Sequence, residues 1–142
     1  MRISILGAGN MGGAIFNNLY HRREFELALI DPKIDKIWKS LGKSSKLEPP
    51  LLFRDLQQYT QNLKQQKTIL VLAIKPKQLS PLHEEIKVSK NLSFANFLIV
   101  SVVAGISLST LRKIFKTKNI IRAMPNTPVT VGQGMTGLYF PK

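Results

Sequence analysis

The sequence predicts an α/β fold in which a doubly wound, mostly parallel sheet carries helices on both faces. Short runs rich in Val, Ile and Leu alternate along the chain with segments whose apolar residues recur at helical spacing. Continuous apolar runs are typical of strands buried on both faces, and their alternation with helices favours right-handed βαβ units. The 142 residues are enough for one domain over 1–142, and no internal linker or repeat divides them.

Seven apolar runs are predicted to be strands, and the strongest of them is TILVLAI. The predicted strands span residues 3–6, 25–31, 51–53, 68–74, 96–103, 119–124 and 134–140. Helices are predicted over 11–19, from Asp35 to about Leu41, over 56–65 behind Asp55, from near Pro81 to 87, and over 108–115 behind Ser107. Asp and Ser favour the start of a helix because their side chains accept hydrogen bonds from its first N–H groups.

The composition limits the classes of function. Lys and Arg number 21 against 8 Asp and Glu, which gives a formal net charge of +13 that can attract anionic partners. The basic residues are scattered without interleaved aromatics, so a solvated lysine-rich surface is favoured over a nucleic-acid-binding face. There is no cysteine, and no apolar run approaches the roughly 20 residues of a membrane-spanning helix. We therefore expect a cytoplasmic protein with no nucleic-acid or membrane partner.

A glycine pattern marks the junction between the first predicted strand and the first predicted helix. Gly7, Gly9 and Gly12 match G-x-G-x-x-G, in which a strand, a tight turn and a helix receive a pyrophosphate. The first glycine allows unusual backbone angles, the second leaves room for a phosphate, and the third lets the helix pack closely on the strand. N–H groups around Asn10 and Met11 would face the phosphates. The alternative is a glycine-rich turn that binds no ligand.

The end of the second predicted strand is expected to lie beside the adenosine ribose in such a Rossmann-like fold. Asp31 follows Gly12 by 19 residues, near the spacing at which a carboxylate accepts a hydrogen bond from the ribose 2′-hydroxyl of NAD. Lys33 and Lys36 favour NADP instead, because either can pair with its 2′-phosphate. Asp31 can also be a turn residue before Pro32. The choice between NADPH and NADH therefore stays open.

Three further loops follow predicted carboxyl ends of strands, where ligands of such sheets bind. Lys75-Pro76 follows one strand, Ala104-Gly105 another, and Asn126 a third. Proline stiffens a loop, small residues leave room for a ring, and lysine and asparagine offer a charge and an amide. Each loop taken singly is ordinary turn chemistry, whereas together with the glycine turn the loops favour a site.

Four segments together resemble a known enzyme family. GAGNMGGAI, LAIKPKQ, SVVAGIS and IIRAMPNTPVTVGQGMTGLY are similar, in order and spacing, to the N-terminal domain of pyrroline-5-carboxylate reductase. The resemblance covers essentially the whole chain and is much more specific than the glycine pattern alone. It implies transfer of a hydride from NADPH or NADH to the C=N bond of 1-pyrroline-5-carboxylate, which gives proline.

The resemblance also implies roles for individual residues. Gly7 to Met11 would hold the pyrophosphate, and Asn126 would help shape the nicotinamide and substrate region. Ala73, Lys75 and Pro76 would lie along the cofactor toward its nicotinamide end, with Ala104 and Gly105 near the ring. The full set expected to bind the cofactor is Gly7, Ala8, Gly9, Asn10, Met11, Gly12, Asp31, Lys33, Ala73, Lys75, Pro76, Ala104 and Gly105. The resemblance identifies no proton donor among them, so the catalytic residues stay unidentified, and no metal ion is expected.

The chain departs from the family in one respect. Family members continue into a helical C-terminal domain that builds the dimer and binds the substrate through a Ser-Gly-Ser-Gly-Pro-type segment and a threonine, and nothing like that segment occurs here. We expect a truncated gene product or one half of a split gene, which needs a complementing C-terminal domain or a homo-oligomer for activity. The alternative is a dinucleotide-binding module without catalytic activity.

Overall fold

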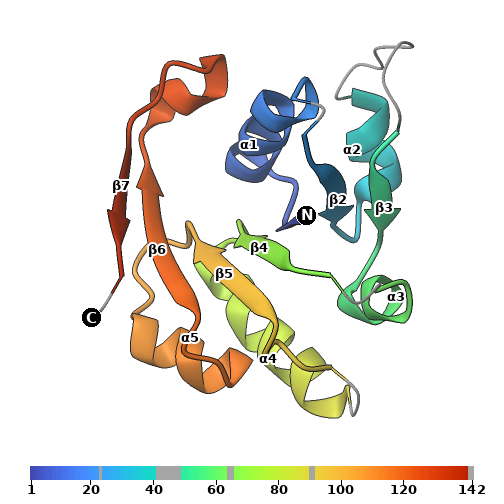
Figure 1. Ribbon diagram of the computed structural model, residues 1–142, viewed down its shortest axis with the longest axis vertical. Coiled ribbons are helices and arrows are strands. Elements are labelled where there is room, and N and C mark those ends of the chain that lie inside the picture. Colours follow the sequence, from blue (N-terminus) through green and yellow to red (C-terminus); the bar gives the residue numbers. More distant parts are fainter. Residues whose placement is uncertain (23, 41–48, 64–65, 90–91, 141–142) are drawn as a thin grey trace.

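The computed structural model describes residues 1–142 apart from 23, 41–48, 64–65, 90–91 and 141–142. Within that part of the chain, seven strands form one sheet in the order β3-β2-β1-β4-β5-β6-β7 (Figure 1). The strands are β1 (Arg2–Leu6), β2 (Glu26–Ile30), β3 (Leu51–Phe53), β4 (Thr68–Leu72), β5 (Phe97–Ser101), β6 (Ile120–Pro125) and β7 (Thr136–Tyr139). The strand order reverses beside β1 and helices cover both faces, so the predicted doubly wound fold class is confirmed.

Neighbouring strands are parallel in every pair of the described sheet except β6 with β7. Ile3 of the central strand β1, for example, lies opposite Leu27 of β2 on one side and Ile69 of β4 on the other. Only a 3₁₀ turn, η2 (Thr127–Val131), lies between β6 and β7, whereas a parallel connection needs a crossover of about a dozen residues or more. The last predicted strand is therefore present as an antiparallel strand at the edge of the sheet.

The helices pack on the two faces and bury a separate apolar cluster on each. The described helices are α1 (Asn10–Tyr20), α2 (Ile34–Ser40), α3 (Leu56–Gln61), α4 (Leu79–Val88) and α5 (Leu108–Phe115), with a 3₁₀ segment η1 (Pro76–Gln78) before α4. On the face of α1 and α2, Phe16 packs with Ile5 of β1. On the face of α3, α4 and α5, Leu111 packs with Ile99 of β5. Each fully buried side chain of this size stabilises the fold by about 1.5–3 kcal/mol.

Two helix starts differ from the sequence prediction. α2 begins at Ile34, whose N–H donates to the Asp31 carbonyl at 3.0 Å, so Asp35 lies inside the first turn and is not the N-cap. The Asp35 carboxylate still interacts favourably with the positive end of the helix dipole from that position. α4 begins at Leu79 rather than near Pro81, because the first turn of a helix leaves its N–H groups unbonded and tolerates a residue that lacks one.

The prediction for α3 is confirmed at its start and too long at its end. The Asp55 carboxylate accepts a hydrogen bond from the N–H of Gln58 at 2.7 Å, as an N-cap does, and the helix ends at Gln61. Ser107 caps α5 in the same way, with the N–H of Thr110 at 3.1 Å from its Oγ. Residues 41 and 64–65, to which the predicted helices extend, lie outside the described residues.

Candidate functional site

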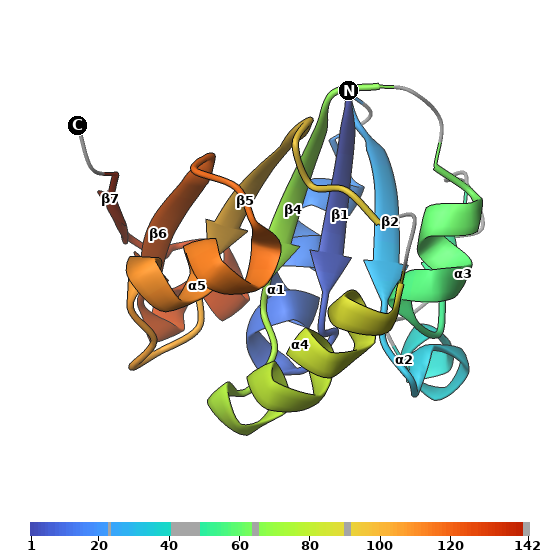
Figure 2. The same cartoon turned by 90° about the horizontal axis from the view of Figure 1, so that it is seen from below.

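The carboxyl ends of β1, β4, β5 and β6 lie along one edge of the sheet because these strands are mutually parallel (Figure 2). The glycine turn, residues 73–76, residues 102–105 and Asn126 follow these four strands. The N–H of Ala73 donates to the Leu6 carbonyl at 2.8 Å, and the N–H of Val102 donates to the Leu72 carbonyl at 3.0 Å. The structure therefore brings the predicted segments to one edge of the sheet, which we call the carboxyl edge.

Two glycines of the turn occupy positions that admit no side chain. Gly7 has a φ of +93°, and a Cβ on it would lie 2.8 Å from the carbonyl oxygen of Ala73. A Cβ on Gly12 would lie 1.9 Å from the carbonyl oxygen of Gly7, so α1 packs directly on the turn. The structure thus confirms the tight turn that the sequence predicts, and it confirms the close approach of the helix to the strand.

Gly9 differs from the other two glycines because no atom lies within 4 Å of the place that a Cβ would take. It is the N-cap of α1, where no side chain caps the helix and the first turn holds no acidic residue. Gly9 and Asn10 are both exposed. The first N–H groups of a helix have no partner within the helix, and the helix dipole adds partial positive charge. Open space and available donors suit an anion such as a pyrophosphate.

Asp31 follows the end of β2 and is bonded to the glycine turn. One carboxylate oxygen accepts from the N–H of Ala8 at 2.9 Å, and the other accepts from the N–H of Lys33 at 2.8 Å. Asp31 therefore acts as a turn residue, which is the alternative role that the sequence predicts for it. Each carboxylate oxygen has a second lone pair, so a hydrogen bond from a ribose hydroxyl to Asp31 stays a prediction.

Ala73, Lys75 and Pro76 follow β4 beside the glycine turn. Ala73 is half-buried, and its Cβ lies 3.2 Å from the place that a Cβ on Gly12 would take. Lys75 and Pro76 are exposed, with the N–H of Lys75 donating to the side-chain oxygen of Gln78 at 2.9 Å. Residue 75 therefore presents an exposed ammonium group from the carboxyl edge, although its contact with a cofactor stays a prediction.

The turn after β5 is held by a residue that the sequence prediction misses. Ala104 and Gly105 are exposed, and Gly105 has a φ of +72° with no atom within 4 Å of a Cβ position. From β6, the guanidinium of Arg122 donates to the carbonyl of Ile106 through Nη1 and to the carbonyl of Val103 at 3.4 Å through Nη2. The signal for this contact in the sequence is a single charge within the apolar run NIIRAM.

Asn126 closes the loop that joins β6 to β7. Its N–H donates to the Met135 carbonyl at 3.0 Å, and its Oδ1 accepts from the N–H of Met135 at 2.8 Å. The following segment η2 packs on α1, where the side-chain nitrogen of Asn18 donates to the Val129 carbonyl at 2.8 Å. The loop is therefore held against the helix that begins at the glycine turn.

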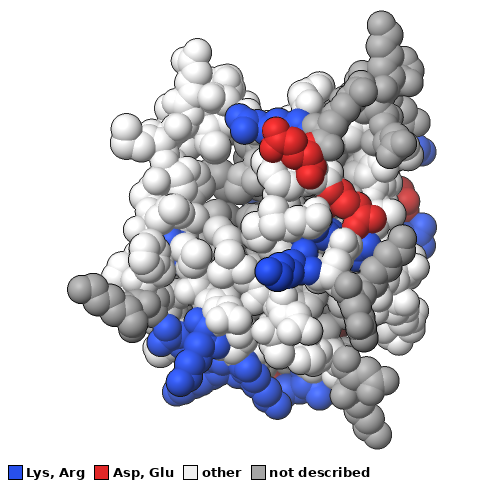
Figure 3. Space-filling model, viewed as in Figure 1, with Lys and Arg blue, Asp and Glu red and all other residues white. Residues whose placement is uncertain are grey.

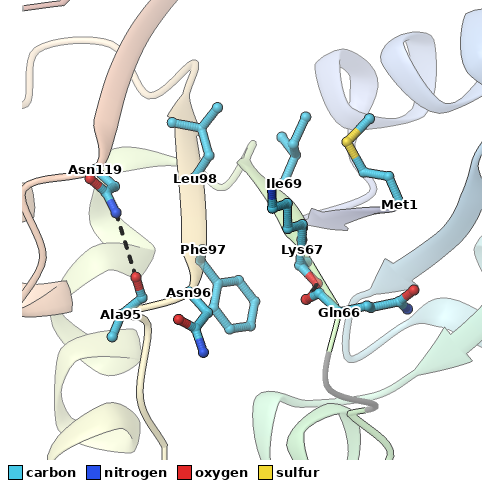
Figure 4. Close-up of a pocket in the computed structure, with 10 residues that line it drawn as sticks. Met1, Gln66, Lys67, Ile69, Ala95, Asn96, Phe97, Leu98 and Asn119 are labelled. Atoms are coloured by element: carbon cyan, nitrogen blue, oxygen red, sulfur yellow. Dashed lines mark hydrogen bonds between the residues drawn. The ribbon is translucent and has the colours of Figure 1, made fainter.

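A hollow of about 770 Å³ lies at the opposite edge of the sheet, which we call the amino edge, near the starts of β4, β5 and β6 (Figure 4). Among its ten lining residues Lys67 has the one charged side chain, and apolar groups come from Met1, Ile69 and Leu98. None of the predicted site residues lines this hollow. The hollow and the carboxyl edge are therefore separate places in the molecule.

Basic side chains gather over α5 (Figure 3, lower left). Arg112 and Lys113 lie in the last turn of α5, and Lys116 is its C-cap. Cations at this end of a helix interact favourably with its dipole, which accounts for their placement without a ligand. Because α5 leads into the start of β6, the group lies toward the amino edge.

Tyr59 and Glu84 have shifted pKa values, and neither is among the predicted site residues. Burial raises the pKa of the Tyr59 hydroxyl, whose oxygen is 2.7 Å from the Ser4 Oγ. The hydrogen bond from Lys87 lowers the pKa of Glu84. Within the residues that the structure describes, no group of three or more His, Cys, Asp or Glu side chains could hold a metal ion.

The reversed strand order, the positive φ of Gly7 and the open helix N-terminus at Gly9 define a Rossmann-type dinucleotide-binding domain. The chain belongs to the family described as NADP oxidoreductase, coenzyme F420-dependent, whose model matches residues 2–105. None of the described helices has the length and apolar character needed to cross a membrane.

Curated relatives match nearly the whole chain. Pyrroline-5-carboxylate reductase of Escherichia coli strain K12 is 31% identical over 141 residues, which cover 96% of this chain and 48% of that enzyme. The Pasteurella multocida enzyme of the same name is 29% identical over 140 residues, which cover 96% of this chain and 48% of the relative. The chain thus spans about half the length of these relatives.

A solved structure provides the same comparison in three dimensions. Plasmodium falciparum pyrroline carboxylate reductase, solved with NADP bound, superposes with a TM-score of 0.63 at 21% identity. The match covers 100% of this chain and 48% of that one. This likeness shows the fold, and together with the curated relatives it confirms the resemblance to the N-terminal domain of pyrroline-5-carboxylate reductases.

Proposed function

We propose that this chain is the dinucleotide-binding half of a pyrroline-5-carboxylate reductase and holds NADPH or NADH beside 1-pyrroline-5-carboxylate. The observation that carries the proposal is the glycine turn, in which Gly7 and Gly12 bring α1 against β1 while Gly9 leaves open space at the helix N-terminus. The cofactor supplies the hydride that reduces the C=N bond of the substrate, giving proline. Relatives of that name match 96% of the chain, which supports this reaction over other nicotinamide chemistry.

In this proposal the chain binds and orients the cofactor along the carboxyl edge. The N–H groups at Asn10 and Met11 donate to the pyrophosphate, with Ala8 and Gly9 forming the turn beneath it. Ala73, Lys75 and Pro76 lie along the cofactor toward its nicotinamide end. The ring at the nicotinamide end lies against Ala104 and Gly105, whose small size leaves room for it, and Asn126 borders the substrate. The proton that completes the reduction is not assigned to any of these residues.

The adenosine ribose is proposed to lie between Asp31 and Lys33. Both oxygens of the Asp31 carboxylate already accept from backbone N–H groups, at 2.9 and 2.8 Å, which lessens the repulsion of a 2′-phosphate. Lys33 is exposed and can pair with that phosphate. These two features favour NADPH as the cofactor while leaving room for NADH.

Reduction of the substrate is proposed to need groups beyond this chain, supplied by a complementing C-terminal domain or by a homo-oligomer. The second candidate function is a dinucleotide-binding module without reductase activity, which the glycine turn and the open N-terminus of α1 support equally well. We also propose a cytoplasmic location. The chain contains no cysteine, and a reduced cofactor and a chain without cysteine both suit a reducing compartment.

Calorimetric titration of the purified chain with NADPH and with NADH tests the proposal. We expect saturable binding, and we expect Gly9→Asp to abolish it because the carboxylate fills and charges the pyrophosphate space. Gly137→Asp is the matched control, since nothing lies within 4 Å of a Cβ there either and Gly137 is exposed on β7. Absence of binding by the folded chain, or equal loss in both variants, contradicts the proposal.

A reductase assay separates the two candidate functions. The chain is assayed with 1-pyrroline-5-carboxylate, alone and mixed with the C-terminal half of the Escherichia coli relative expressed separately. Activity that appears only in the mixture supports the complemented reductase. Binding of NADPH with no activity in either case supports the module, and strong activity of the chain alone shows that no complementing domain is needed.

A further inference from the structure

Arg122 occupies an unusual position for a charged side chain. It lies on β6 within the sheet and is half-buried. None of the ion pairs among the described residues includes it. Its guanidinium donates instead to two backbone carbonyls, those of Val103 and Ile106.

These two carbonyls stand on either side of the exposed turn formed by Ala104 and Gly105. The turn depends on the left-handed conformation of Gly105, with a φ of +72°, and the space around a Cβ there is empty. The turn therefore has few packing contacts of its own, and the bridge from Arg122 fixes the separation of its two ends. A planar guanidinium can meet two carbonyls at once, whereas an ammonium group acts as a point charge.

We propose that Arg122 is a positioning residue that holds the Ala104–Gly105 turn in the shape that receives the nicotinamide end of the dinucleotide. This inference rests on the proposed function, because it assumes that the cofactor binds along the carboxyl edge. Arg122 acts through the turn and touches neither ring nor substrate. Its removal therefore weakens contacts at the nicotinamide end and leaves those at the glycine turn intact.

Binding at the two ends of the cofactor can be measured separately with two ligands. NADPH has both ends, whereas 2′-phospho-ADP-ribose lacks the nicotinamide ring. Calorimetry on Arg122→Met is expected to show about tenfold weaker binding of NADPH, equivalent to the loss of a hydrogen bond to a charged group. Binding of 2′-phospho-ADP-ribose is expected to stay within about twofold. Arg122→Lys is expected to fall between. Arg22→Met, which removes an exposed arginine just beyond the C-terminal end of α1, serves as the control.

Gly105→Ala tests the same turn without touching Arg122. The added methyl meets no atom within 4 Å, so its effect comes from the backbone conformation alone. We expect the same selective loss of NADPH binding, and little additional loss when the two changes are combined, because both act on one turn. If Arg122→Met fails to fold, Gly105→Ala and Arg122→Lys decide the question.

Three results overturn the inference. They are equal weakening of both ligands, unchanged NADPH binding in the folded variants, and equal affinity of the unaltered chain for the two ligands. Failure of the unaltered chain to bind either ligand is a different outcome, because it overturns the proposed function itself and the inference with it.

Discussion

The two edges of the sheet present polar groups of different kinds. At the amino edge and in the middle of the central strand β1, polar side chains are buried and bonded to one another. Arg2 is 1% exposed and donates to Glu26 at 2.9 Å, and the hydroxyl oxygens of Ser4 and Tyr59 are 2.7 Å apart. At the carboxyl edge, Gly9 and Asn10 are exposed at the start of α1, where no side chain caps the helix. The buried polar groups therefore stabilise the fold, whereas the start of α1 leaves backbone N–H groups without a partner in the helix.

This difference shows why volume alone is a poor guide to the site. The hollow of about 770 Å³ lies at the amino edge and is lined mainly by apolar and amide groups, with Lys67 as its charged side chain. A dinucleotide needs backbone donors, a helix N-terminus and room beside the main chain. Those features occur together at the glycine turn.

The largest expected effect on stability is at Gly12. In Gly12→Ala, the added Cβ meets the backbone oxygen of Gly7 at 1.9 Å, so α1 must move away from the turn. We expect the free energy of unfolding in urea to fall by about 3 kcal/mol or more, at the upper end of overpacking effects.

Gly137→Ala is the control for that change, because a Cβ at Gly137 meets nothing within 4 Å. Its stability should stay within about 0.5 kcal/mol of the unaltered chain. Equal stability of the Gly12 and Gly137 variants would show that the turn is less tightly packed than these distances indicate.

A smaller effect is expected at Tyr59, one of the buried polar groups that stabilise the fold. Tyr59→Phe leaves the buried hydroxyl of Ser4 without its partner and should lower the free energy of unfolding by about 1–2 kcal/mol. Adding Ser4→Ala should recover part of that loss. NADPH affinity should not change in the folded variant, since the Tyr59 hydroxyl bonds to Ser4 in the middle of β1 and not to the glycine turn.

Tyr139→Phe is the matched control for Tyr59, because Tyr139 is 61% exposed on β7 and its loss of a hydroxyl should leave stability unchanged. If the Tyr59→Phe variant is fully folded and still binds NADPH more weakly, the buried polar groups affect cofactor binding. The division between groups that stabilise the fold and groups that bind the cofactor would then be wrong.

The smallest expected effect is at Lys33. Lys33→Gln should weaken NADPH binding by roughly threefold, the size of an exposed ion pair, and should leave NADH binding unchanged. The control is Lys39→Gln, in the last turn of α2 and therefore at the other end of that helix. Equal weakening of both cofactors would contradict contact between Lys33 and the 2′-phosphate.

Features that depend on neighbours in the chain could be predicted from the sequence. The buried strands are continuous apolar runs, and their pattern does not depend on which strand lies beside which. Caps at Asp55 and Ser107 follow from local hydrogen bonds spanning three residues. Asp35 is the exception, because the bond between Ile34 and the Asp31 carbonyl starts the helix earlier.

Features that depend on distant parts of the chain could not be predicted in the same way. The bond from Ala8 to Asp31 joins residues 23 apart, and the bonds from Arg122 reach back 16 and 19 residues. Such contacts depend on the order of strands and the shapes of loops. The glycine turn is different, because its roles are encoded within six consecutive residues, Gly7 to Gly12.

The most direct test of the account is to ask which edge of the sheet responds to NADPH. In a two-dimensional NMR titration of the ¹⁵N-labelled chain, we expect shifts at the amides of Gly9, Asn10, Met11 and Gly105, and none at Lys67 or Asn96. Shifts confined to Lys67 and Asn96, or no shifts at saturating NADPH, would contradict a cofactor site at the carboxyl edge.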